Sequence, residues 1–183
     1  MLRPSFKVLA RNWWPVVVWL GVIRLESTDY ASSTATFGLL YKTFTLIFGR
    51  VDPRLLLELN GVLRKSGHFI GYAILSLLVF LALKHAHRDR LKPLLQRSWG
   101  TFFRDTWQFD WAVIAVLFTL MTAALDEIHQ TFLSSRTGRW QDVALDTSGA
   151  LMMQVLLYAR ATHINSRRRR QESVQEAEHS ITH

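Results

Sequence analysis

Apolar residues in this 183-residue chain form a few nearly uninterrupted blocks, and charged residues lie in the gaps between the blocks. The clearest blocks cover residues 67–83, 111–125 with an apolar continuation to 133, and 143–158, and a shorter one covers 12–23. A bilayer core of about 30 Å is crossed by roughly 20 residues of helix. The pattern predicts an all-α integral membrane protein, a small bundle of about four transmembrane helices. The expected spans lie near residues 12–27, 67–84, 110–133 and 142–159.

The distribution of Lys and Arg predicts the orientation of these spans. Three basic residues precede the first span, six lie in the loop 84–109, and five follow the last span, whereas the connection 134–141 holds only Arg136 and Arg139. Cytoplasmic segments carry an excess of Lys and Arg, so both termini are predicted to be cytoplasmic. These segments, next to anionic lipid, also account for the net charge of +8. No basic and aromatic pattern of a nucleic-acid module is present, so no nucleic-acid partner is expected. The chain has no Cys, which excludes disulfides, thiolate metal sites and cysteine nucleophiles.

Three segments leave alternatives open. Residues 37–48 are mostly apolar, but about 12 residues are too few to span, so an interfacial or re-entrant helix in the first outer loop is favoured over a fifth span. The first block follows Arg3, Lys7 and Arg11, as in a signal peptide, yet it is rich in Trp and lacks a convincing cleavage site. We therefore expect it to be an uncleaved helix. Residues 1–163 form the predicted transmembrane domain, and residues 164–183, charged and poor in apolar residues, are predicted to be a disordered cytoplasmic tail.

Ionisable and polar side chains gather at the predicted outer ends of three spans. Residues three, four or seven positions apart share a helix face. The candidate residues are Lys65, His68 and Tyr72 from the second span, Asp126, Glu127, His129 and Gln130 from the third, Asp142 and Asp146 from the fourth, and Arg136 and Arg139 from the outer connection. We expect this set to converge at one membrane surface.

Three of the acids lie within apolar sequence, where a charge has a free-energy cost. A charge well inside the hydrocarbon costs about 2.5–3.5 kcal/mol on insertion scales. Asp126, Glu127 and Asp146 should therefore face the bundle interior and pair with Lys65, Arg136 or the histidines. Buried ion pairs that fix helix register are one interpretation, and a functional site is the other, because the set exceeds what packing requires. His68, His129 and the acids are metal-ligand types, but their spacing matches no dedicated metal motif. No metal and no cofactor are predicted.

Three short motifs in this order resemble the VanZ-like membrane protein family. They are Arg64-Lys65-Ser66-Gly67-His68-Phe69 with Tyr72, then Asp126-Glu127-Ile128-His129-Gln130 with Phe132, then Arg136, Asp142 and Gly149. The resemblance covers roughly residues 12–160. It implies a multi-pass protein of the bacterial cytoplasmic (inner) membrane, in a family named for a member associated with resistance to the glycopeptide teicoplanin. It implies no catalytic mechanism. Asp146 departs from the family pattern, which commonly has Asn there, and Met153 stands where glycine is expected.

Two hypotheses for function follow. In the first, an outward-facing polar site binds or modifies a lipid-linked or anionic polymer molecule of the envelope. Lys65, Arg136 and Arg139 would receive phosphate, with His68 or His129 as general base and Asp126 or Glu127 as orienting group or acid. Tyr72, Gln130, Asp142 and Asp146 would complete the binding site. In the second, the protein is a non-enzymatic scaffold and the polar cluster is a structural lock. Whether the protein is an enzyme, and whether it oligomerises, stays open; membrane lipid is the expected surrounding partner. A transporter is a third reading, but four short helices leave little room for a path without oligomerisation.

Overall fold

The chain is helical wherever the structure, a computed structural model, describes it, at residues 6–27, 33–91, 107–132 and 139–181 apart from short ends and turns. The five helices are α1 (Phe6–Glu26), α2 (Ser33–Phe48), α3 (Pro53–Leu91), α4 (Phe109–Thr131) and α5 (Trp140–Ile181). No strand occurs among the described residues. The all-α prediction is confirmed.

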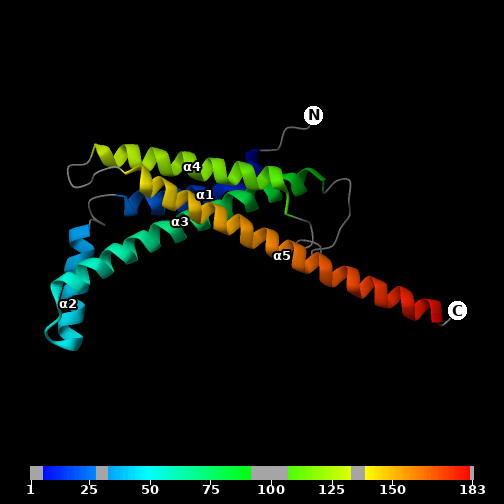
Figure 1. Cartoon of the computed structure of the whole chain (residues 1–183). Helices are drawn as coiled ribbons and strands as arrows, with labels where there is room; N and C mark the ends of the chain where they lie inside the picture. The colour runs from blue at the N-terminus through cyan, green and yellow to red at the C-terminus, as the bar shows by residue number, and fades with distance from the viewer. Residues whose placement is uncertain (1–5, 28–32, 92–106, 133–138, 182–183) are drawn as a thin grey trace.

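Helices α1, α3, α4 and α5 form one bundle (Figure 1). Within it α3 packs against the other three helices, and α4 also packs on α5. Apolar side chains fill its core, including Val16 and Ile23 of α1, Leu75, Val79 and Phe80 of α3, and Ala112, Ala115 and Ala123 of α4. Small residues such as these alanines let helix backbones approach closely. The indole nitrogen of Trp19 donates a hydrogen bond of 2.8 Å to the carbonyl oxygen of Gly71, which ties α1 to α3 inside the bundle.

α3 begins much earlier than the predicted second span at residues 67–84. It has 39 residues, or about 58 Å at 1.5 Å per residue. Asp52 explains the early start, because its carboxylate accepts a 2.9 Å hydrogen bond from the backbone N–H of Arg54, as an N-cap does. Pro53 then occupies the first helical position, which suits proline. The predicted start of the second span, near residue 67, therefore lies inside α3.

α2 is the short apolar helix expected near residues 37–48. It has 16 residues and packs on α3, to which it is joined through Gly49, whose φ of 76° is accessible to glycine. The resulting α2–α3 hairpin projects away from the bundle in Figure 1. Leu39, Leu46, Ile47 and Phe48 are exposed on it.

α5 is 42 residues long and continues to Ile181, so the structure differs from the expected disordered tail at 164–183. Its second half leaves the bundle, as Figure 1 shows. After Gly149 the helix contains neither glycine nor proline, and Arg, Gln, Glu and Ala are good helix formers. Local propensity therefore favours helix where the composition favours exposure to water.

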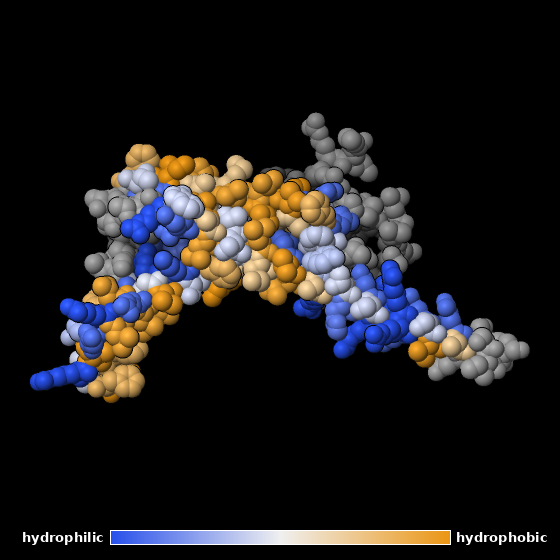
Figure 2. Space-filling view, viewed as in Figure 1, coloured by the Kyte–Doolittle hydropathy of each residue, from blue (hydrophilic) through white to orange (hydrophobic). Residues whose placement is uncertain are grey.

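Two helical segments, Pro53–Ala86 and Phe109–Gln130, are long and apolar enough to cross a membrane by length and composition. Figure 2 shows an apolar band across the middle of the bundle with hydrophilic regions on both sides of it. Several polar side chains are buried within the bundle, and many large apolar side chains are exposed on its outside.

Candidate functional site

The predicted polar residues meet at one end of the bundle, where α1 and α4 end, α5 begins and the middle of α3 passes. A cavity of about 200 Å³ opens there, which we call the polar cavity. It is lined by Gly61, Arg64, Lys65 and His68 of α3, Glu127 and Gln130 of α4, and Asp142, Leu145 and Asp146 of α5. The expected convergence of Lys65, His68, Glu127, Gln130, Asp142 and Asp146 is thus found in the structure.

The two sides of the polar cavity carry opposite charge. α3 contributes the side chains of Arg64 and Lys65, whereas α4 and α5 contribute three carboxylates. Helical spacing creates the basic side, because Gly61, Arg64, Lys65 and His68 recur at three or four positions. A ligand in this cavity would meet cations on one side and hydrogen-bond acceptors on the other.

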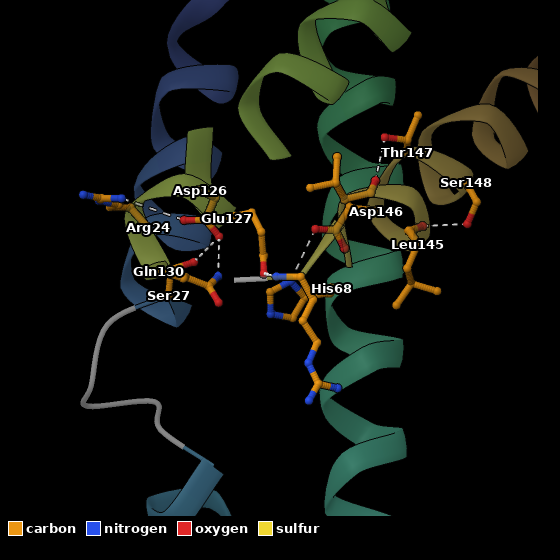
Figure 3. Close-up of polar contacts among 12 residues, drawn as sticks. Arg24, Ser27, His68, Asp126, Glu127, Gln130, Leu145, Asp146, Thr147 and Ser148 are labelled. Atoms are coloured by element: carbon orange, nitrogen blue, oxygen red, sulfur yellow. Dashed lines mark hydrogen bonds and ion pairs between the residues drawn. The ribbon is translucent and has the colours of Figure 1, made fainter. Parts of the chain in front are cut away.

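His68 and Asp146 face each other across the cavity, with 3.6 Å between His68 Nδ1 and Asp146 Oδ2 (Figure 3). The side chain of Asp146 is only 3% exposed, and its Oδ1 has no hydrogen-bond partner among the described residues. The His68 ring also stacks on Tyr72 at 6.3 Å between centroids. The Tyr72 hydroxyl is buried and likewise has no hydrogen-bond partner in the described part of the chain. Buried polar atoms are nearly always paired, so both atoms are candidates to contact a ligand or water.

Asp126 lies beside the polar cavity and is linked to it through Gln130 (Figure 3). Its Oδ2 accepts hydrogen bonds from Ser27 Oγ at 2.6 Å and from Gln130 Nε2 at 2.9 Å. Arg24 approaches the other oxygen at 3.8 Å. The expected partners were Lys65, Arg136 and the histidines, but the described contacts come from the end of α1 and from α4 itself. This carboxylate ties α1 to α4.

Glu127 has a fixed role at the start of α5. Its Oε1 accepts a hydrogen bond from the backbone N–H of Arg139, the residue before α5 begins. A carboxylate near a helix N-terminus is favoured by the exposed N–H groups and the helix dipole. Arg139, expected to bind phosphate with its side chain, thus contacts the site through its backbone.

His129 and Arg136 are the remaining predicted residues of the site. His129 is half-buried on α4 and does not line the polar cavity. Arg136, with its expected phosphate contact, lies outside the described residues. Among the residues that the structure describes, no group of three or more His, Asp or Glu could hold a metal ion.

The sequence patterns did not indicate several polar contacts, both beside the site and deeper in the bundle. Arg24 and Ser27 lie within the predicted first span, and neither was expected to bind Asp126. A buried link between Gln154 Nε2 and Ser76 Oγ, 2.9 Å long, was also missed. The signal for it was present, because Gln154 is a polar residue inside the apolar block 143–158.

Gly149, part of the third motif, permits the close approach of α3 and α5. A Cβ placed there would overlap the backbone carbonyl group of Phe69. This contact sets the distance between the helices that carry His68 and Asp146. A glycine in this motif therefore has a structural reason.

The comparison with known families agrees with these motifs. A protein-family model described as VanZ/LLP1 matches residues 13–161, which include the bundle and every residue of the polar cavity. No curated protein and no solved structure matches the chain. Because the match covers most of the chain, the protein belongs to the VanZ/LLP1 family.

Proposed function

We propose that α1, α3, α4 and α5 cross the bacterial cytoplasmic membrane as four spans, with the polar cavity outward and both termini cytoplasmic. α1 exposes Trp14 and Val17, and α5 exposes Leu151 and Val155, so these helices also present apolar surface outside the bundle. Basic residues gather at the other end of the bundle, at Arg11 of α1, Lys84 of α3, and Arg160 and 167–170 of α5. This placement supports a cytoplasmic location for that end.

The α2–α3 hairpin belongs, in this proposal, to the outer interface of the membrane. α2 is about 24 Å long, less than the hydrocarbon thickness of about 30 Å. Its exposed apolar side chains favour lipid contact, while Arg50, Asp52 and Arg54 at the turn are exposed and suit the headgroup region.

We infer that the polar cavity binds a phosphate-bearing, lipid-linked or anionic molecule of the envelope. The observation that carries this function is the opposition of Arg64 and Lys65 to three carboxylates in one cavity. The basic side suits phosphate, which Arg binds as a bidentate fork and Lys as a point charge. The acidic side suits hydroxyl or amino groups such as those of a sugar, since carboxylates accept hydrogen bonds.

The His68–Asp146 pair gives the same site a means of proton transfer. With Nδ1 directed at Asp146, the other ring nitrogen can accept a proton from a bound hydroxyl group, and Asp146 fixes the ring orientation. Asp126, held by three described contacts, serves better as a positioning residue than as an acid. The proton carrier in this proposal is His68, with Asp146 orienting its ring and Glu127 fixing the start of α5.

The test uses the full-length protein purified in detergent and lipid bound to it, measured by native mass spectrometry. Lys65→Gln should lose most of the bound phosphate lipid, because it removes a cation of the cavity. Arg54→Gln is the matched control, since Arg54 is an exposed cation on the same helix that does not line the cavity. Equal lipid retention by both variants would overturn the proposal. Teicoplanin tolerance of cells that carry each variant is the corresponding envelope phenotype.

The contacts of Asp126 favour a second candidate function, a non-enzymatic scaffold in which the polar residues lock the bundle. In that case Asp126 variants lose stability, and cavity variants such as Lys65→Gln lose neither lipid nor phenotype. The two candidates therefore differ in which residues matter.

A further inference from the structure

A second cavity adjoins the polar cavity. Its volume is about 330 Å³, and it lies between the end of α1, α2 and α3. Leu39 and Leu40 of α2 and Leu63 of α3 provide apolar surface, and Gly67 adds backbone. Polar groups at its edges come from Glu26, Thr36 and Asn60. Arg64 and His68 line both cavities, so the two are neighbours with shared residues. We call this second space the apolar cavity.

Glycines in α3 give each cavity part of its space. A Cβ at Gly61, in the polar cavity, or at Gly67, in the apolar cavity, would meet nothing within 4 Å. Close packing of the protein against itself therefore does not demand glycine at either position, in contrast to Gly149. Glycine is among the least favourable residues inside a helix. Glycine at both positions leaves this space open to a bound molecule.

We propose that the apolar cavity binds the hydrocarbon chain of the phosphate lipid whose headgroup occupies the polar cavity. This inference rests on the proposed function of the polar cavity. The two spaces together match an amphiphile, because Arg64 lies where they meet and can contact phosphate, while the leucines line the path of the chain. The exposed apolar surface of α2 would connect this cavity with the surrounding lipid.

The two cavities should contribute differently. A hydrocarbon chain that moves from the bilayer into an apolar cavity leaves one apolar environment for another, so little hydrophobic free energy is gained. Affinity must come mainly from the headgroup, whereas the apolar cavity fixes where the chain lies. The position of the chain is therefore the decisive measurement.

The experiment uses full-length protein in phosphatidylcholine vesicles that contain phosphatidic acid with a photoactivatable diazirine in its acyl chain. A second arm carries the diazirine in a polyisoprenyl phosphate, and a third in phosphatidylcholine itself. Labelled residues are located by mass spectrometry. At least one phosphate probe should label Leu39, Leu40 and Leu63 more strongly than the phosphatidylcholine probe does, and the stronger arm identifies the chain type.

Glycine substitutions then separate the two cavities. Gly67→Phe fills the apolar cavity and should abolish labelling of the leucines while the phosphate lipid remains bound. Gly61→Phe obstructs the polar cavity and should abolish both. Gly21→Phe is the matched control, because Gly21 is exposed on α1 and a Cβ there also meets open space. Leu40→Asn makes the wall polar and serves as the second variant if Gly67→Phe does not fold.

The results distinguish a failure of the chain site from a failure of the proposed function of the polar cavity. Equal labelling by the phosphatidylcholine probe, or unchanged labelling in Gly67→Phe and Leu40→Asn, would overturn the chain site. If Gly61→Phe still abolished lipid binding in that case, the proposed function of the polar cavity would stand. Unchanged binding in Gly61→Phe would overturn both.

Discussion

Asp126 offers the sharpest test of how the site is built, because its described contacts tie the end of α1 to α4. Asp126→Ala removes the acceptor of Ser27 Oγ and of Gln130 Nε2. The substitution leaves a hydroxyl and an amide buried without that partner, since Ser27 is 1% exposed and Gln130 is 7% exposed. We expect α1 to separate from α4 at this end of the bundle.

The size of the effect follows from these contacts. A buried polar group left unpaired costs about 1–3 kcal/mol in soluble proteins, whereas hydrogen bonds between membrane helices average about 0.6 kcal/mol. The pair with Arg24 adds less than about 1 kcal/mol, because it is 3.8 Å long and Arg24 is 53% exposed. The two unpaired groups and the Arg24 pair together give a loss of about 1–7 kcal/mol. At about 2–4 °C per kcal/mol for a chain of this size, a loss of about 3 kcal/mol lowers Tm by about 6–12 °C.

The assay is thermal unfolding in detergent, followed by circular dichroism, for Asp126→Ala and for Asp142→Ala. Asp142 is a matched control, because it is a half-buried acid that lines the polar cavity. Ser27→Ala and the double variant with Asp126→Ala complete a double-mutant cycle, which should give a coupling energy of about 0.5–3 kcal/mol. If Asp126→Ala melted at the same temperature as Asp142→Ala and the cycle gave no coupling, Asp126 would not be a lock.

Three further sets of variants test other contacts. Gly149→Ala should lower Tm, since overpacking costs about 1–3 kcal/mol. Gly67→Ala should instead raise Tm through a gain in helix propensity of up to about 1 kcal/mol. The opposite order of the two Tm values would contradict the assigned packing. Ser76→Ala should destabilise by about 0.6–1.7 kcal/mol, and the double variant with Gln154→Leu should recover most of this loss, which a double-mutant cycle in detergent measures. His68→Gln should retain bound lipid in native mass spectrometry but abolish any proton-dependent modification of it, so loss of lipid would assign His68 to binding instead.

The agreement between sequence and fold depends on what ends each helix. The predicted span 110–133 nearly coincides with α4 (Phe109–Thr131), and the first predicted span ends within a residue of α1 (Phe6–Glu26). The start of α3 was misplaced because hydropathy changes near residue 67, whereas the helix itself starts at the cap formed by Asp52. The second half of α5 was missed for the same reason. Hydropathy reports the solvent around a helix, while capping and propensity decide its length.

The candidate site was predictable where it depended on spacing within one helix. Lys65 and His68 share a side of α3 that lines the polar cavity, and Asp142 and Asp146 do so on α5. The partner of each side chain was not predictable, because it depends on how neighbouring helices rotate about their axes. Asp126 therefore contacts α1, which spacing within the third predicted span could not indicate.

The three deeply placed acids differ in what remains available to a ligand. Asp126 is engaged by three described groups and Glu127 by the backbone of Arg139. Asp146 keeps one buried oxygen without a described partner and directs the other at His68. It also stands where the family resemblance leads us to expect asparagine, a residue of nearly the same size that has one acceptor oxygen and no charge. A carboxylate partner for His68 is therefore the feature of this polar cavity that differs from the family pattern. Asp146→Asn keeps the shape of this side chain and removes its charge, so it separates the two contributions to the site.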